Sequence, residues 1–236
     1  YIENELILKD FSLKIKAGTS VALVGATGSG KSTIVNLICR FYEPTTGEIL
    51  IDGKNYKERS IGWLHENLGY VLQTPHLFNG TIMENIKYGR LDATDEEVIE
   101  AAKLANAHDF IMRLPKGYDT DISGDGASLS QGQRQLIAIA RAAVADAPVM
   151  ILDEATSSID TRTEKIVQDG MDKLMEGRTV LVIAHRLSTV VDADIIYLVR
   201  EGKILEKGNH EQLMELNGRY AYMFNVQKHL YESKDN

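Results

Sequence analysis

The segment Gly25-Ala26-Thr27-Gly28-Ser29-Gly30-Lys31-Ser32 constrains the fold of this chain more than any other. Four apolar residues, Val21–Val24, precede it, and an apolar pattern at helical spacing, beginning at Ile34, follows it. The spacing G-x-x-x-x-G-K-S/T between a strand and a helix is typical of a phosphate-binding P-loop. Its glycines allow the backbone N–H groups to point at phosphate oxygens, beside the positive end of the helix. A glycine-rich turn with a solvent-exposed lysine is the alternative.

Two carboxylates follow a second apolar run. Val149–Leu152 is continuous and of strand length, and Asp153 and Glu154 come directly after it. Ligands of parallel α/β sheets bind at the carboxyl ends of the strands, so both acids are expected to face the phosphates. Asp153 is predicted to bind Mg²⁺, and Glu154 is predicted to orient or deprotonate the attacking water. Alternatively, the two acids cap a turn or begin the next helix.

Strand and helix patterns alternate along the chain and predict an α/β fold with a mainly parallel sheet. The apolar runs Val21–Val24, Val149–Leu152 and Val180–Ile183 have the composition of strands that are buried on both faces. Helical patterns occupy residues 94–105, 131–144 and 161–175, and residues 75–145 are rich in helix, which predicts an inserted helical lobe. Further strands are expected at Phe11–Ile15, Ile49–Ile51 and Tyr70–Leu72.

Composition sets broader limits. The chain has 236 residues, enough for one domain, and its 26 Lys and Arg against 34 Asp and Glu give a formal charge of −8. An acidic balance disfavours a broad nucleic-acid surface. The single cysteine, Cys39, excludes an internal disulfide, and no apolar run approaches the ~20 residues of a membrane span. Because the sequence begins at Tyr1 rather than Met, we expect a fragment of a longer protein.

Three further features identify a family. Leu129-Ser130-Gln131-Gly132-Gln133 opens a helical pattern, Gln73 follows an apolar strand pattern, and His185 follows the strand pattern that ends at Ile183. Together with the two phosphate motifs, in this order, they closely resemble the nucleotide-binding domain of ABC transporters over essentially the whole chain. The resemblance implies one domain over residues 1–236. Its RecA-like P-loop NTPase core would carry an N-terminal antiparallel β subdomain and an α-helical subdomain at roughly 75–145.

The resemblance also implies a site for ATP and Mg²⁺ that is completed by a second nucleotide-binding domain. The residues implied to contact nucleotide within the chain are Tyr1, Gly25, Thr27, Gly28, Ser29, Gly30, Lys31, Ser32, Thr33 and Gln73. Those implied to contact it from the second subunit are Ser130, Gly132 and Gln133. The implied metal ligands are Ser32, Gln73 and Asp153, the implied catalytic residues are Glu154, His185, Gln73 and Lys31, and Asp160 would cross the dimer interface. Taken alone, Ser130 would be a simple helix N-cap.

Other segments resemble the exporter branch of this family, including Phe41-Tyr42-Glu43-Pro44 and Ile183–Ser188. That resemblance implies a homodimer or heterodimer, a transmembrane domain fused N-terminally, and a place on the cytoplasmic face of the cell membrane without nucleic acid. The alternative is a soluble ABC-type ATPase that acts on nucleic acid or ribosomes. Chromosome-maintenance relatives insert a long coiled coil, for which the stretch from Gln73 to Ser130 leaves no room. A non-enzymatic ATP sensor would be expected to lack Glu154 or Lys31.

Overall fold

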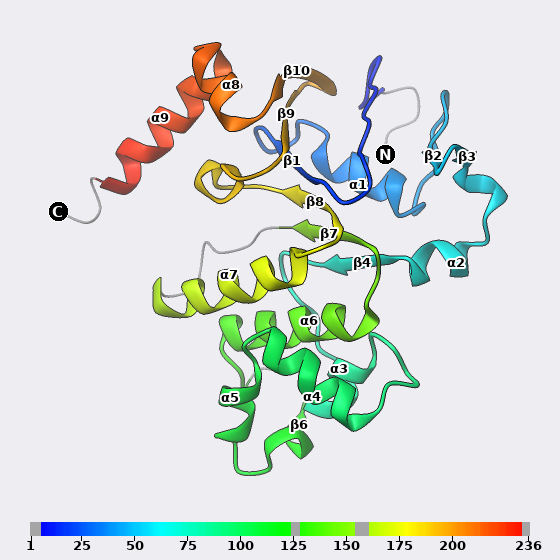
Figure 1. The fold of residues 1–236 in the computed structure, drawn as a ribbon, viewed down its shortest axis with the longest axis vertical. Helices are drawn as coiled ribbons and strands as arrows, with labels where there is room; N and C mark the ends of the chain where they lie inside the picture. Colours follow the sequence, from blue (N-terminus) through cyan, green and yellow to red (C-terminus); the bar gives the residue numbers. More distant parts are fainter. Residues whose placement is uncertain (1–5, 124–127, 154–160, 233–236) are drawn as a thin grey trace. The chain divides into compact units, whose positions relative to one another are not determined.

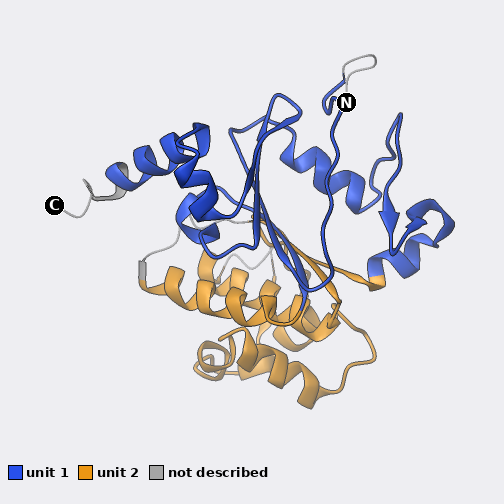
Figure 2. Cartoon of the chain, turned by 45° about the horizontal axis from the view of Figure 1, so that its top comes forward, with its two compact units in different colours: residues 1–65, 178–236 blue, residues 66–177 orange. Residues whose placement is uncertain are grey.

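The computed structural model describes residues 6–123, 128–153 and 161–232 (Figure 1). The chain divides into two compact units. The first contains residues 1–65 and 178–236, and the second contains residues 66–177 (Figure 2). The predicted α/β class is confirmed, because parallel strands joined through helices occur in both units.

The strands of the first unit are centred on β1 (Ser20–Val24). On its two sides lie β8 (Thr179–Ile183) and β9 (Ile195–Arg200), both parallel to it (Figure 1). The outer strand β10 (Lys203–Gly208) runs antiparallel to β9. Residues Val21 to Val24 are 0% exposed, which explains why β1 is a continuous apolar run instead of an alternating one.

The prediction of a strand at Phe11–Ile15 is wrong, because the backbone of this segment does not belong to any strand. Its side chains do alternate between half-buried and exposed, as the sequence pattern predicts. The period of two therefore reports which side chains face the protein, whereas a strand also needs a hydrogen-bonded neighbour. Here the Lys14 carbonyl accepts from the Tyr197 hydroxyl at 3.3 Å.

The antiparallel part of the N-terminal region is a short hairpin. Its strands are β2 (Leu50–Ile51) and β3 (Lys54–Asn55), joined through Asp52 and Gly53, which both have positive φ. This geometry suits an Asp-Gly turn. The remaining elements of the first unit are α1 (Lys31–Ile38), η1 (Tyr56–Glu58), α2 (Ile61–Glu66), η4 (Leu187–Val190), α8 (His210–Glu215) and α9 (Arg219–Glu232).

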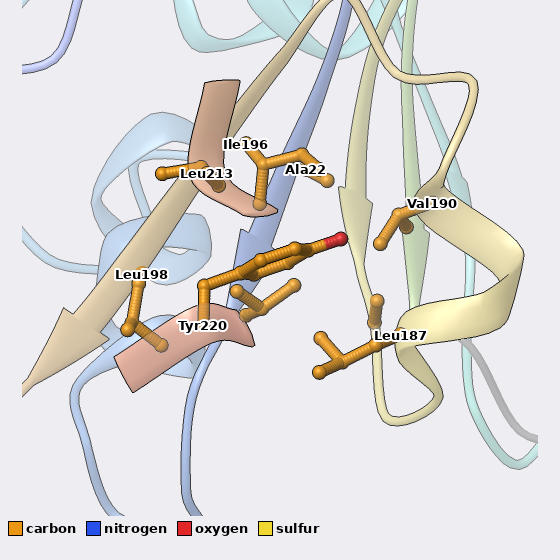
Figure 3. Packing of buried hydrophobic residues seen from close by; sticks show 9 residues of the cluster. Ala22, Leu187, Val190, Ile196, Leu198, Leu213 and Tyr220 are labelled. Atoms are coloured by element: carbon orange, nitrogen blue, oxygen red, sulfur yellow. The ribbon is translucent and has the colours of Figure 1, made fainter. Parts of the chain in front are cut away.

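One hydrophobic cluster of the first unit joins its strands to its last helices. Tyr220 of α9 is fully buried and lies among Ala22 and Ile196 from the strands and Leu187 from η4 (Figure 3). Its hydroxyl lies 2.9 Å from His210 Nδ1, and burial raises the pKa of Tyr220 to about 12. The cluster therefore fixes α9 against the segment that follows β8.

The second unit is built around one long helix. Helix α6 (Gln131–Ala145) contacts α3 (Ile82–Lys87), α4 (Asp95–Leu104) and α7 (Thr161–Met175), as well as strand β4. Its run from Gln135 to Ala140 is buried, so this helix forms the core of the unit. The other elements are β4 (Leu68–Val71), β5 (Gly80–Thr81), α5 (His108–Met112), η2 (Gly117–Asp119), β6 (Asp121–Ile122) and β7 (Val149–Asp153).

Strands β4 and β7 are parallel neighbours, with Val71 opposite Leu152. Their carboxyl ends therefore meet at one edge. Helices dominate residues 82–145 of this unit, and the assignment of residues 75–145 to a separate subdomain stays a prediction. None of the helices in the described part of the chain has the length and apolarity needed to span a membrane.

Candidate functional site: the phosphate loop and its partners

The P-loop is folded as its glycines require. Gly25, Gly28 and Gly30 all have positive φ, at 146°, 79° and 109°. A side chain at Gly25 would collide with the Val199 carbonyl oxygen, and one at Gly30 would come within 2.9 Å of Leu8 Cδ2. The loop is therefore held in close contact with the backbone of its own unit, in conformations that favour glycine.

The P-loop leads into a helix start that has no side-chain cap. Gly30 is the N-cap residue of α1, and it makes no side-chain hydrogen bond that would cap the helix. The Ser29 hydroxyl is buried and, among the described residues, has no hydrogen-bond partner. A helix start without a side-chain cap and a buried hydroxyl donor suit an anion such as phosphate.

Lys31 is not the solvent-exposed lysine of the alternative interpretation. It is 6% exposed, and its Nζ donates to the carbonyls of Gly25 at 2.7 Å and Ala26 at 3.0 Å. These bonds hold the buried Lys31 ammonium inside the P-loop. A buried ammonium is retained only where acceptors compensate its lost hydration, and phosphate oxygens would be further acceptors.

A residue that the sequence did not single out also supports the loop. The Gly202 N–H, in the turn between β9 and β10, donates to the Ser29 carbonyl at 3.0 Å, while the Gly202 carbonyl accepts from the Lys9 N–H at 3.0 Å. A side chain at Gly202 would collide with the Ile7 carbonyl. The Glu201-Gly202 dipeptide indicates a turn in the sequence, but it does not predict that this turn contacts the P-loop, which is distant in the chain.

His185 follows the strand next to the P-loop strand. In the ladder, Leu23 of β1 is paired with Ile183 of β8, so Gly25 and His185 come two residues later at the same edge of the first unit. The Ala184 N–H donates to the Leu23 carbonyl at 3.1 Å, which continues the attachment just beyond β8. The His185 side chain is exposed. The structure thus brings His185 and the P-loop to neighbouring strand ends.

In the second unit, Gln73 and Asp153 likewise lie at the ends of two neighbouring parallel strands. Val71 is opposite Leu152, so the ends of β4 and β7 carry these two polar residues at one edge. Gln73 is exposed, and the backbone just before it is held by α6, since the buried Gln135 Nε2 donates to the Leu72 carbonyl at 3.4 Å. Glu154 is the next residue after Asp153, and it lies outside the described residues, as do Tyr1 and Asp160.

Ser130 is the N-cap of α6. Its hydroxyl accepts from the Gln133 N–H at 3.2 Å, and the Gln133 side-chain oxygen accepts from the Ser130 N–H at 2.9 Å, forming a capping box. The first intrahelical bond runs from the Arg134 N–H to the Ser130 carbonyl, so the N–H groups of Gln131 and Gly132 precede it. The N-cap interpretation of Ser130 is correct. It is compatible with an anion site, because a hydroxyl that accepts one bond still carries a donor proton.

A buried polar hub shapes the segment that follows Gln73. Asn85 is 2% exposed and exchanges hydrogen bonds of 2.8 Å with the backbone N–H and C=O of Phe78. The Arg141 guanidinium of α6 donates to the Asn85 carbonyl at 2.8 Å and to the His76 carbonyl at 2.9 Å. It also lies over the Phe78 ring, and burial lowers the pKa of Arg141. Sequence reasoning missed this hub, because Arg141 is 56 residues away from Asn85 in the chain.

We expect Asn85→Ala to destabilise the second unit by about 2–3 kcal/mol. The N–H and C=O of Phe78 and the Thr81 carbonyl, which accepts from Asn85 Nδ2 at 3.0 Å, would lose their partner at about 1 kcal/mol each. Urea unfolding followed by circular dichroism measures the loss. Asn79→Ala, at an exposed position of the same segment, is the matched control and should unfold like the parent. Equal stability of the two variants would contradict the assignment of the hub.

The residues implied to bind Mg²⁺ have suitable chemistry. Ser32 offers a hydroxyl, Asp153 a carboxylate and Gln73 an amide oxygen, and oxygen ligands of this kind are what Mg²⁺ prefers. Asp153 ends β7, and Ser32 lies in the first turn of α1. Within the ranges that the structure describes, no group of three or more His, Cys, Asp or Glu residues forms a metal cluster by itself. Phosphate oxygens and water would have to complete the coordination.

The comparisons with known proteins agree on one family. Residues 8–157 match the ABC transporter family model. The ABC transporter ATP-binding protein YfiC of Bacillus subtilis (strain 168) is 52% identical over 227 residues, which are 96% of this chain and 38% of that protein. A Staphylococcus aureus (strain NCTC 8325 / PS 47) protein, named for multidrug export as an ATP-binding/permease protein, is 50% identical over 228 residues, 96% of this chain and 39% of that protein.

Among solved structures, a bacterial Atm1-family ABC exporter with ATP bound matches with a TM-score of 0.90 and 45% sequence identity, covering 96% of this chain and 40% of that one. The chain thus spans about two fifths of the length of the relatives that it matches. The likeness covers the P-loop and the Gln73 segment, as well as the capped start of α6, in the order found here. The chain therefore belongs to the ABC transporter family and is an ATP-binding domain of that family, which is an ATPase.

Proposed function

We propose that this chain is the motor domain of an exporter, in which binding and hydrolysis of ATP drive transport through a transmembrane domain of the same polypeptide. The observation that carries the proposal is the 45% identity to an exporter solved with ATP bound, joined to the names of longer relatives that combine ATP binding with a permease. These names favour export over the soluble alternative. They also support a place at the membrane, and the proposal assigns the domain to its cytoplasmic face.

Within one chain, the P-loop would hold the phosphates. The buried Ser29 hydroxyl and the backbone N–H groups of the loop would donate to phosphate oxygens, except the Ser29 N–H, which donates to the Ala26 carbonyl at 3.2 Å. Lys31 would move from its carbonyl acceptors to the β- and γ-phosphates. Tyr1 would stack on adenine. His185, at the end of the neighbouring strand β8, would donate to the γ-phosphate.

Ser32, Gln73 and Asp153 would hold Mg²⁺, which when bound neutralises charge on the β- and γ-phosphates. Glu154, the residue after Asp153, would accept a proton from the attacking water. Gln73 follows a strand end whose backbone is fixed by Gln135, so its side chain would be presented from a defined place. None of these side chains needs to form a covalent bond to the nucleotide.

The start of α6 would complete the site of a second subunit, and Asp160 would lie at the interface between the two. The arrangement of the helix supports this part of the proposal. The N–H groups of Gln131 and Gly132 precede the first intrahelical bond, and Ser130 is exposed. Because the P-loop is a separate anion site on another helix, one chain offers two half-sites, and two chains arranged head to tail would form two complete ones.

The test is complementation between two inactive variants. We expect chains carrying Lys31→Ala and chains carrying Ser130→Asn to be inactive alone and to regain about a quarter of parental activity when mixed equally, because half of the dimers are mixed and each has one intact site. Asn is chosen because it keeps the N-cap, whereas Ala costs about 1 kcal/mol of helix stability. ATPase activity of the mixture is the measurement.

The control is an equal mixture of parent chains and chains that carry both Lys31→Ala and Ser130→Asn. It contains one quarter parental dimers and serves as a reference for random exchange. Mixed dimers are verified by tags on the two chains. If verified mixed dimers of the single variants hydrolyse no ATP, Ser130 does not act in the partner's site.

A further inference from the structure

The last helix of the first unit is hydrogen-bonded to the backbone around His185. The Gln227 side-chain oxygen accepts from the Leu187 N–H at 2.9 Å, and the Gln227 Nε2 donates to the His185 carbonyl at 3.4 Å. One carboxamide thus contacts the backbone on both sides of Arg186. Because an amide group can donate and accept at once, Gln227 is suited to fix such a pair of neighbouring backbone groups.

Helix α9, which carries Gln227, is itself anchored at its start. The Glu206 carboxylate of β10 accepts from the Arg219 N–H at 2.6 Å and from the Tyr220 N–H at 3.0 Å. These are two of the helix's first N–H groups, which have no partner within the helix, and a carboxylate there is favoured by the helix dipole. The beginning of α9 is therefore fixed to the strand β10.

The inward face of α9 connects this anchor to the His185 segment. Tyr220 and Gln227 are seven residues apart, two turns of helix, and so lie on the same face. Tyr220 packs on Leu187 and Val190 of η4 (Figure 3). Tyr222 and Val226, which are 59% and 40% exposed, mark the opposite face. The segment that follows His185 is thus packed by Tyr220 and hydrogen-bonded by Gln227.

His185 is held from the other side by the P-loop strand. The Ala184 N–H donates to the Leu23 carbonyl, two residues before Gly25. The backbone of His185 is consequently attached to β1 before it and to α9 after it. Its side chain is exposed, and the place from which it extends is set by this backbone. A change in either attachment is expected to move the imidazole relative to the P-loop.

We infer that Gln227 is a positioning residue for ATP hydrolysis: it holds the backbone of residues 185–187 so that the His185 imidazole meets the γ-phosphate. The inference rests on the proposed function of His185. Gln227 itself touches no phosphate in this assignment and acts only through the histidine. Helix α9 thereby becomes part of the catalytic apparatus, although no sequence motif marks it.

The experiment compares substitutions in the complete polypeptide that contains this chain. Gln227→Met keeps the length of the side chain and removes both hydrogen bonds. We expect it to lower kcat roughly tenfold, because misplacement of a reacting group by about 1 Å can cost up to ~100-fold in rate. The KM for ATP should stay at the parental value, since the P-loop is unchanged. Gln227→Glu keeps an acceptor for the Leu187 N–H and should recover part of the rate.

A matched control and a second background separate positioning from general stability. Asn225→Leu removes an exposed amide from the same helix and should hydrolyse ATP like the parent. In a His185→Ala background, Gln227→Met should cause no further loss, because the group that it positions is gone. A stability effect would instead lower the rate by the same factor in both backgrounds. Melting temperatures of all variants are measured alongside.

The outcomes distinguish this inference from the function on which it rests. If His185→Ala hydrolyses ATP at the parental rate, the proposed role of His185 is wrong. If His185→Ala is slow but Gln227→Met is as fast as the parent, or slows both backgrounds equally, the role of Gln227 is wrong and that of His185 stands. A loss seen only when His185 is present, with partial recovery in Gln227→Glu, supports the inference.

Discussion

Replacement of Lys31 by Met is expected to reduce ATP hydrolysis by about 10²–10³-fold, the range observed when one preorganised donor to a developing charge is removed. Lys31 is buried, and its ammonium already lies in the loop on the carbonyls of Gly25 and Ala26. Met keeps the packing of the long aliphatic stem and removes only the charge and the donors. The loss should therefore appear in nucleotide binding and turnover while the fold is retained.

Fluorescent ATP analogues measure the binding, and phosphate release measures the turnover. Lys31→Ala should show the same loss and, in addition, some loss of stability from the missing stem. Lys203→Met, at an exposed position of β10, is the matched control and should behave like the parent. In membrane vesicles that contain the complete protein, transport should stop with hydrolysis. Parental turnover by Lys31→Met would contradict the assignment of the phosphate site.

Glu154→Gln is expected to lower hydrolysis by about 10²–10⁴-fold, the usual effect of losing a general acid or base. The amide keeps the size of the side chain and some of its hydrogen bonding, but it cannot accept the proton from the attacking water. ATP binding should persist, and it should tighten because a negative charge next to the γ-phosphate is removed. The protein should accumulate as an ATP-bound dimer.

Size-exclusion chromatography with ATP and Mg²⁺ measures the accumulation as a shift to twice the monomer mass. Glu176→Gln, just beyond the end of α7, is the exposed control and should elute and hydrolyse like the parent. Two results would count against the assignment in different ways. Near-normal turnover would remove Glu154 from catalysis, whereas loss of ATP binding would give it a role in the structure of the site.

The elements around the site were predictable because their sequence patterns are local. The apolar run that ends at a glycine predicts the strand β1. Helices α6 and α7 begin at their expected residues, 131 and 161. In α6 the capping box supplies a signal at the start, since Ser130 and Gln133 are three residues apart. Local patterns of this kind need no knowledge of the rest of the fold.

What could not be predicted depends on partners far away in the chain. The strand β9 is a plain apolar run, yet its place beside β1 depends on a pairing over more than 170 residues, as the Ser20–Asp194 hydrogen bond shows. The support of the P-loop by Gly202 and of His185 by Gln227 has the same character. Helix α9 is aromatic on several sides, so only the cluster around Tyr220 decides which face is inside.

The capping box of α6 gives Ser130 two separate requirements to meet. Folding demands a side chain that caps the helix, and Asn, Asp and Thr satisfy this demand about as well as Ser. The proposed contact with the nucleotide of a partner demands a hydroxyl group, which Asn and Asp lack. A selection for folded chains alone would therefore tolerate more residues at position 130 than a selection for growth that depends on the transporter. Residues that are tolerated for folding but not for growth would show which property of Ser130 serves the nucleotide contact and not the helix cap.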